Sequence, residues 1–291
     1  HPCALARLDR LLPTTEDKAR AGLSSLDNAD TIETIAAGVL ALIDGHLEEA
    51  MADFRWMQTR FLAAEMQYRR SGAYKQTDPG ELHSGIYAPD EMRRYMTGLL
   101  MSQVLWPQHR RLLAWYLERF LPDCDPEGGY LEIGPGHGLT LALSAKRLSL
   151  ASAHGWDVSE TSLAMSRHAL EALSPDTRFC PALRDVCGPL REDDPRVATA
   201  VLGQVLEVVP SPEAAMRSLA QIVLPGGRLF LNCPIEAAAP DHVRRWTHSD
   251  QIDDLLKEGG FRIVQTESVG VGRSDGPSLY AVIAERSAGT A

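Results

Sequence analysis

The chain has 291 residues, 44% of them hydrophobic, and carries a formal net charge of −10. Its length suits two domains or one domain with an appendage, and its composition is that of a water-soluble globular protein. The excess of acid disfavours a nucleic-acid substrate, because proteins that bind phosphate backbones usually present a basic face.

Cysteine usage and hydropathy limit the compartment and the cofactors. The five cysteines are odd in number and none is spaced as C-x-x-C, which argues against a zinc site and favours a reducing environment. No apolar run reaches the ~18 residues that a membrane-spanning helix needs. We therefore expect a cytoplasmic protein that holds no metal and does not bind a membrane.

The first part of the chain, residues 1–124, has the pattern of helices. Apolar residues recur at helical spacing from Ile32 to Leu62, and further helices are predicted at about Asp90–Val104 and Pro107–Phe120. A polar, glycine-containing break at Gly72–Gly85 separates the two groups. We expect a helical cap over a binding site elsewhere in the chain, with homodimer contacts through the same helices. A purely scaffolding or dimerisation role is the alternative.

The stretch Tyr130–Thr140, with the sequence YLEIGPGHGLT, predicts a short buried strand that leads into a glycine-rich turn and then a helix. Glycines at such a turn let a ligand approach the backbone closely, at the carboxyl end of a parallel strand. A dinucleotide fingerprint has the spacing G-x-G-x-x-G. Here Leu139 stands where its third glycine would be, so the spacing disfavours a nicotinamide cofactor.

The next predicted strand, His154–Asp157, ends in an acid that lies 23 positions after Gly134. A carboxylate about 20 residues beyond a glycine turn can accept hydrogen bonds from ribose hydroxyls. Ser159 follows as the predicted N-cap of a helix. Asp157 therefore indicates nucleoside binding without identifying the nucleoside.

Strands and helices alternate through the rest of the chain. Thr247 and Asp250 are spaced as a capping box for the last helix. The alternation predicts a doubly wound, mostly parallel sheet. A glycine-rich loop without a helix joins the last two strands, which indicates that the final strand inserts antiparallel. The predicted elements are strands at Thr177–Pro181, Val197–Leu202, Arg228–Cys233, Phe261–Glu267 and Leu279–Glu285, and helices at Pro212–Val223 and Ser249–Glu258.

Three segments together resemble class I S-adenosylmethionine-dependent methyltransferases of the small-molecule type. The first is Glu132, an acid two residues before the G-x-G-x-G run that begins at Gly134. The second is the stretch 205–209, VLEVV, which is similar to a family pattern V-L-E-H-V with Val208 in place of its histidine. The third is the stretch 224–231, LPGGRLFL, which matches the turn before the family's fifth strand. The resemblance covers roughly residues 125 to 285.

The resemblance implies a Rossmann-like, seven-stranded sheet whose last strand is antiparallel, preceded by an N-terminal helical cap. It implies that residues 1–124 form the cap or dimerisation domain and that residues 125–291 form the domain that binds S-adenosylmethionine and releases S-adenosylhomocysteine. In such enzymes Asp157 would bind the ribose, while Asp185 and the backbone amide of Val186 would bind the adenine. The complete set of cofactor residues expected on this basis is Glu132, Gly134, Gly136, Gly138, Asp157, Val158, Asp185, Val186 and Gln204.

The acceptor side is less defined by sequence. The segment from His242 to Thr247 is similar to a family segment H-x-R-x-[FYW]-[ST], which lies beside the acceptor pocket in relatives. The nucleobase-methylating motif N/D-P-P-Y/F is replaced by residues 203–206, GQVL, so we expect a small-molecule acceptor. Candidate general bases are His242, His83 and Glu207, and candidate acceptor contacts are Tyr87, Arg244 and Trp246.

The sequence leaves three functions open. The favoured one is methyl transfer to an oxygen, nitrogen or carbon nucleophile of a small molecule, in specialised, biosynthetic metabolism. A nicotinamide-dependent oxidoreductase is the alternative enzyme. A non-catalytic module that binds S-adenosylmethionine would need the same glycines and acids as an enzyme does.

Overall fold

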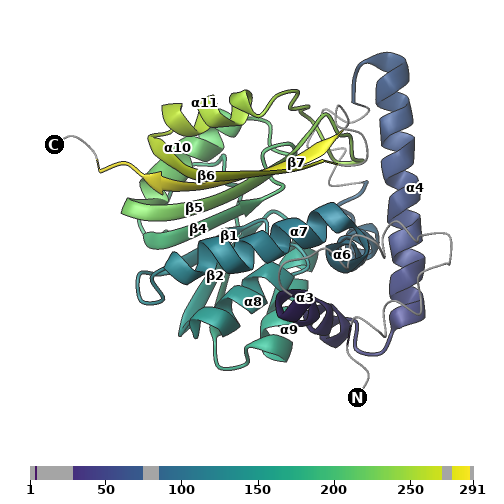
Figure 1. Ribbon diagram of the computed structural model, residues 1–291, viewed down its shortest axis with the longest axis horizontal. Helices are drawn as coiled ribbons and strands as arrows, with labels where there is room; N and C mark the ends of the chain where they lie inside the picture. The colour runs from purple at the N-terminus through teal and green to yellow at the C-terminus, as the bar shows by residue number, and fades with distance from the viewer. Residues whose placement is uncertain (1–3, 5–28, 75–84, 271–276, 289–291) are drawn as a thin grey trace.

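A computed structural model describes residue 4 and residues 29–74, 85–270 and 277–288. Its centre is a seven-stranded sheet in the order β3-β2-β1-β4-β5-β7-β6 (Figure 1). The first five strands pair in parallel, and β7 runs antiparallel to both β5 and β6. This confirms the predicted doubly wound sheet with an antiparallel last strand. The strands are β1 (Tyr130–Ile133), β2 (Ser152–Asp157), β3 (Arg178–Leu183), β4 (Val197–Gly203), β5 (Val223–Ile235), β6 (Phe261–Gly270) and β7 (Ser278–Arg286).

Alternate residues of each central strand supply the cores on the two faces of the sheet, because successive side chains of a strand point in opposite directions. Val201 and Phe230 face one core, while Leu202 and Leu231 face the other. The first core contains α8 (Leu139–Leu148) and α9 (Glu160–Leu173), and the second contains α10 (Pro212–Ile222) and α11 (Asp250–Glu258).

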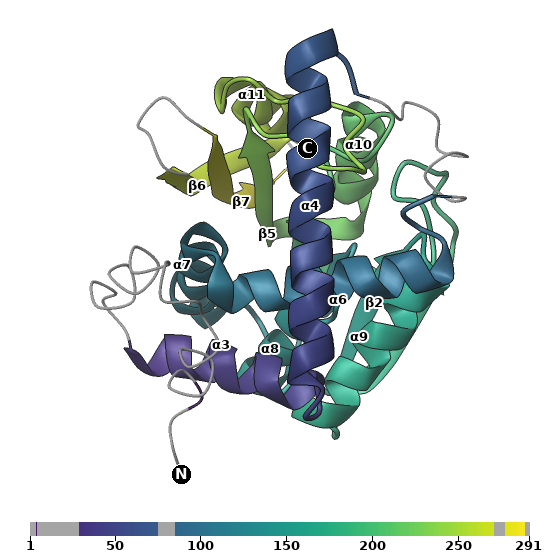
Figure 2. The same cartoon turned by 90° about the vertical axis from the view of Figure 1, so that its right-hand side faces the viewer.

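The helices before β1 are α3 (Ala29–Leu42), α4 (Leu47–Ser71), α6 (Pro89–Leu105) and α7 (Pro107–Trp115). Helices α3 and α6 contact α9, and α7 contacts β6 and β7, so all three pack on the face of the sheet that carries α8. Helix α4 lies outside them, against α6 (Figure 2). A side chain at Gly98 of α6 would lie 2.7 Å from the Met57 Cβ of α4, so these two backbones can approach only because Gly98 lacks one. These helices share one core with the sheet, and the predicted domain boundary at 124/125 remains a prediction.

Two local expectations differ from the structure. The predicted helix Pro107–Phe120 is α-helical only as far as Trp115 and continues as a π-helix over Tyr116–Phe120, where the Tyr116 hydroxyl lies 2.7 Å from Ser144 Oγ. The capping box of Thr247 with Asp250 is wrong. Instead, Gln251 Oε1 accepts hydrogen bonds from the backbone of Thr247 at 2.8 Å and of His248 at 3.1 Å. Ser159, in contrast, caps α9 as predicted, since its side chain accepts from the Ser162 amide.

Gly138 joins the glycine turn to α8 and offers a test of this packing. Its φ of +77° is in the left-handed region, and a Cβ there would lie 2.5 Å from Ser166 Cα of α9. Gly260 has a similar φ of +79° with nothing within 4 Å of an added Cβ, so it is a matched control. We expect Gly260→Ala to lower the free energy of unfolding by about 1–2 kcal/mol, the cost of the left-handed backbone alone.

We expect Gly138→Ala to lose a further ~1–3 kcal/mol, because α8 and α9 must separate to admit the methyl group. Urea denaturation of the two variants measures the difference. Equal losses would contradict the close approach of the two helices.

Candidate functional site

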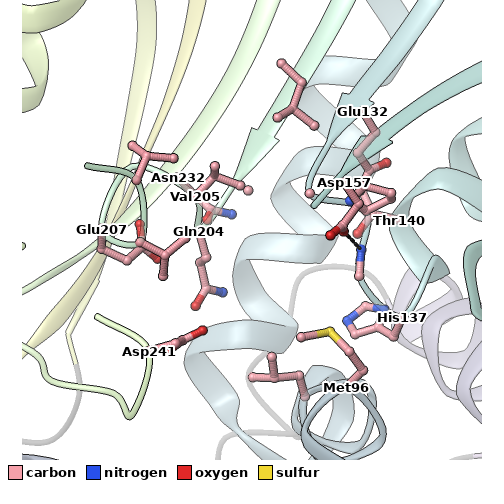
Figure 3. A pocket seen from close by; sticks show the side chains of 18 of the residues that line it. Met96, Glu132, His137, Thr140, Asp157, Gln204, Val205, Glu207, Asn232 and Asp241 are labelled. Atoms are coloured by element: carbon pink, nitrogen blue, oxygen red, sulfur yellow. Dashed lines mark hydrogen bonds between the residues drawn. The ribbon is translucent and has the colours of Figure 1, made fainter. Parts of the chain in front are cut away.

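A cavity of about 640 Å³ opens at the carboxyl ends of β1, β2 and β4 and is bounded on the other side by α6 and α7 (Figure 3). In the strand order, β1 is flanked by β2 on one side and β4 on the other. Successive crossovers therefore diverge at β1 and β4, which creates the crevice where open α/β sheets bind their ligands.

The glycine turn after β1 forms the floor of the cavity. Gly134 has φ +67° and Gly136 has φ +54°. A Cβ at Gly134 would lie 2.7 Å from Val205 Cγ2, and one at Gly136 would lie 2.8 Å from Met96 Sδ. The turn therefore presents bare backbone to the cavity. His137 supports it by accepting a hydrogen bond from the Leu139 amide at 3.2 Å, and burial lowers the pKa of His137 to about 4, so its ring is neutral.

Asp157, at the end of β2, ties the second strand to this turn. Its carboxylate accepts hydrogen bonds from the Ser159 amide at 2.9 Å and the Gly136 amide at 3.4 Å (Figure 3). Burial raises the pKa of Asp157 to about 6, although the backbone donors act in the opposite direction. Each oxygen retains acceptor capacity, since a carboxylate has about four lone-pair sites.

Glu132 lies deeper, on β1, at the end of a buried hydrogen-bond chain. Tyr130 donates its hydroxyl to the carboxyl at 3.1 Å, and the Tyr116 hydroxyl lies 2.9 Å from that of Tyr130. The chain ends at Ser144, which donates to the Thr140 carbonyl. Burial raises the pKa of Glu132 to about 8. Glu132 is thus mostly protonated at neutral pH when nothing cationic lies beside it.

The loop after β4 forms the opposite wall. Gln204 has φ +54°, an uncommon conformation for a residue with a side chain and one that clusters at functional sites. Its backbone amide donates to the backbone carbonyl of Asn232 at 3.0 Å, and its side chain points into the cavity (Figure 3). Glu207 is 1% exposed and accepts from the Cys233 thiol at 3.3 Å. Burial raises the pKa of Glu207 to about 8.

The segment after β5 and helix α6 close the remaining side. Tyr95 donates its hydroxyl to Asp241 at 2.9 Å, and Tyr87 donates to the same carboxylate at 3.4 Å. Next to them, His242 is buried, and its Nδ1 has no hydrogen-bond partner among the residues that the structure describes. Burial lowers the pKa of His242.

Most residues predicted from sequence line this one cavity, and their roles remain predictions. Gly138 instead packs against α9, and Trp246 lies in the core beneath the Arg244 guanidinium. His83 lies outside the described residues. The predicted residues that line the cavity are Tyr87, Glu132, Gly134, Gly136, Asp157, Val158, Asp185, Val186, Gln204, Glu207, His242 and Arg244.

Sequence reasoning assigned no role to several residues that the structure brings to the cavity. Tyr95 and Met96 were part of a helical pattern, and nothing in that pattern distinguished the face toward the cavity from the rest of the core. Asp241 lies immediately before His242, the first residue of the segment similar to the family, and that position is the available signal.

The described residues contain neither a membrane-spanning helix nor a metal-binding cluster. No helix in ranges 29–74, 85–270 or 277–288 is long and apolar enough to span a bilayer. Within the same ranges, no group of three or more His, Cys, Asp or Glu side chains is arranged to hold a metal ion.

Comparison with known proteins matches a large part of the chain to one family of domains. A family model described as "Methyltransferase domain" matches residues 105–266, more than half of the chain. No curated protein matches the chain in sequence.

Similar solved structures share the fold at low identity. An O-methyltransferase family protein from Burkholderia thailandensis has a TM-score of 0.57 and 14% identity, covering 82% of this chain and 72% of that one. Magnesium protoporphyrin IX methyltransferase (ChlM) from Synechocystis PCC 6803, solved with bound SAH, has a TM-score of 0.55 and 16% identity, covering 72% and 99%. The [4+2]-cyclase SpnF has a TM-score of 0.50 and 20% identity, covering 63% and 83%. A cyclase among these structures shows that the fold by itself does not fix the reaction.

The buried Glu132 generates a prediction about stability and pH. Its pKa rises from 4.5 to about 8 on folding, so the folded state holds this proton more tightly than the unfolded state does. Stability contributed by the protonated form is therefore complete below about pH 4.5 and is lost as the pH rises toward 8. Glu132→Gln removes this loss. We therefore expect the free energy of unfolding of the variant, relative to that of the wild type, to increase by at least about 1 kcal/mol from pH 5 to pH 8.

Thermal unfolding of the unliganded protein at both pH values measures this gain. Glu127→Gln, at an exposed position, is the control and should follow the wild type. A difference between Glu132→Gln and the wild type that does not grow with pH would contradict the assigned cause.

Proposed function

Because the chain belongs to the methyltransferase domain family, we propose that it transfers the methyl group of S-adenosylmethionine to a small-molecule acceptor and releases S-adenosylhomocysteine. The observation that carries the proposal is the glycine turn beside the Asp157 carboxylate. Gly134 and Gly136 both line the cavity and carry no side chain, so the turn supplies bare backbone beside which a ligand can lie. The cavity volume of about 640 Å³ suits a small-molecule site.

The residues present fit this cofactor. Asp157 has lone pairs left to accept hydrogen bonds from the ribose hydroxyls. Asp185 and Val186 line the cavity on the same side, where they would bind the adenine. The glycine turn and Glu132 are left for the methionine portion, and Val158 and Gln204 complete the lining.

The charge of the cavity supports a cationic ligand. Its described lining carries five carboxyl groups, on Glu132, Asp157, Asp185, Glu207 and Asp241. Both arginines of that lining have acidic partners, Arg184 with Asp194 and Arg244 with Glu213. Although burial raises the pKa values of Glu132 and Glu207 to about 8, a sulfonium or an ammonium group beside them favours their charged forms and is stabilised by them. The pyrophosphate of a nicotinamide cofactor gains nothing from these groups and would be repelled by the carboxylates that stay ionised. The cavity therefore favours S-adenosylmethionine over the oxidoreductase alternative.

The protein's contribution to the reaction would be to position the acceptor and to exclude water. S-adenosylmethionine supplies a methyl group that its sulfonium already activates. Helices α6 and α7 close one side of the cavity, and holding two reactants in line can contribute ~7–11 kcal/mol. Of the candidate bases, His242 is neutral because burial lowers its pKa, so it can accept a proton at pH 7. Glu207, with its pKa raised to about 8, would first have to lose one.

Finer features of the proposal are a cytoplasmic location, a biosynthetic role in specialised metabolism and homodimer contacts through the N-terminal helices. The cysteines of the described part are unpaired, which agrees with a reducing compartment. Helix α4 leaves Leu62 61% exposed and Met66 45% exposed, and such side chains suit a contact with a second copy.

Calorimetry with S-adenosylmethionine, S-adenosylhomocysteine and NADH tests the cofactor. We expect the first two to bind at micromolar concentrations and NADH not to bind. Binding of NADH in place of the adenosyl compounds would overturn the proposal. Turnover with a panel of small amines and alcohols, read as S-adenosylhomocysteine release, then separates an enzyme from a non-catalytic binding module.

The role of Asp157 can be tested by an isosteric change. Asp157→Asn keeps the shape of the side chain but removes its charge and leaves one oxygen to accept hydrogen bonds. We expect the dissociation constant for S-adenosylhomocysteine to rise about 10-fold to 100-fold, the range of a hydrogen bond to a charged group. Asp176→Asn, at an exposed position, is the matched control. An unaltered affinity in Asp157→Asn would remove the ribose assignment.

A further inference from the structure

The cavity has a second polar centre on the side away from the glycine turn. Asp241 lies across the cavity from Asp157, with Gln204 on its own side (Figure 3). Its side chain is positioned from two directions, because Tyr95 of α6 donates to one oxygen at 2.9 Å and Tyr87 donates to the other at 3.4 Å. The residue is 7% exposed.

The two tyrosines act as donors to Asp241. Burial, followed by the nearby Asp241 charge, raises the pKa of both Tyr95 and Tyr87 well above the usual value. Both phenols therefore keep their protons and stabilise a carboxylate between them. Asp241 has no ion pair with any residue that the structure describes. A buried carboxylate that has hydrogen bonds but no cation favours a ligand that brings one.

The neighbouring groups do not supply that cation. Arg244 stacks on Trp246 at 5.2 Å and lies 3.9 Å from Glu213, so its charge is directed toward other groups. His242 is neutral, because burial lowers its pKa. Its Nδ1 is a second polar atom that has no partner among the described residues, although the residue is more than nine-tenths buried.

Much of the cavity wall is apolar. Helix α6 contributes Met92, Met96 and Leu99, and Phe61 of α4 lies beside them. The sheet contributes Phe230 and Leu279. An acceptor that fits these surroundings carries its charged or polar group at one end of a hydrophobic body.

We propose that Asp241 is the acceptor-binding carboxylate and that the methyl acceptor is an amine on an apolar body, which binds in its ammonium form. The ammonium group gives up one proton to the neutral His242, and the nitrogen lone pair that is freed then takes the methyl group as S-adenosylhomocysteine leaves. Tyr95 and Tyr87 are positioning residues that hold the carboxylate toward the cavity. An acceptor with a carboxylate or phosphate at this end would be repelled by Asp241. This inference rests on the proposed function, because it names the substrate class of the same site.

Matched probes with one apolar body test the amine class. Calorimetry on the protein saturated with S-adenosylhomocysteine compares 4-phenylbutylamine, 4-phenylbutanol and 4-phenylbutyrate. We expect the amine to bind at least about 10-fold more tightly than the alcohol, in line with a charge-assisted hydrogen bond, and the carboxylate not to bind. Equal binding of amine and alcohol, tighter binding of the carboxylate, or no binding of the amine would overturn the proposal.

Variants assign the effect to Asp241. Asp241→Asn should weaken binding of the amine about 10-fold to 100-fold while the dissociation constant for S-adenosylhomocysteine stays within about two-fold. Asp254→Asn, an exposed carboxylate on α11, is the control and should bind the amine as the wild type does. Unchanged amine affinity in Asp241→Asn would overturn the assignment.

A second variant decides the case in which Asp241→Asn does not fold. Tyr95→Phe removes only the hydroxyl that donates to Asp241. It should lower the affinity for the amine and leave the affinity for the alcohol unchanged. Equal effects on both probes would overturn the positioning role and the assignment with it. If the wild type fails to bind S-adenosylhomocysteine, the proposed function fails, and the same amine titrations on the unliganded protein still decide the role of Asp241.

Discussion

The architecture depends on one close approach, where the chain leaves β1 and turns into α8. Gly134, Gly136 and Gly138 all have positive φ there, and an added Cβ would contact a different element at each: the loop after β4, helix α6 and helix α9. The tight turn therefore fixes the distance from the sheet to three neighbours at once. The cavity exists because the same bare backbone that permits this packing also faces the space between them.

Burial of acids is the second physical feature of the site. Glu132, Asp157 and Glu207 all have raised pKa values because they lie away from water, and such groups cluster where a protein needs them for binding or chemistry. Their desolvation lowers the stability of the unliganded protein at neutral pH. A cationic ligand offsets that loss, so the affinity for the ligand and the instability of the empty cavity have one cause.

The sequence predicted what repeats along the chain and missed what depends on distant contacts. Alternating strands and helices gave the sheet, and the spacing from Gly134 to Asp157 brought two residues to one cavity, since parallel strands end at the same edge. Tyr95 was not predictable as a cavity residue, because its helical pattern fits any buried face. Asp241 required the fold as well, since it meets Tyr95 across 146 positions of chain. The hydrogen bond from the Thr247 amide to Gln251 was missed because the predicted capping box assigned the acceptor role to the neighbouring Asp250.

Helix α6 joins two layers of the molecule. One of its faces brings Tyr95 and Met96 to the cavity, while Gly98 lies against Met57 of α4 with no room for a side chain. A change in the size of residue 57 would tilt or shift α6 as a whole, because close-packed helices transmit displacement. Natural variation on the outermost helix could thus retune which acceptors are selected while every residue that touches them stays the same. Relatives that select different acceptors would then differ in the residues of α4 before they differ in the residues that line the cavity.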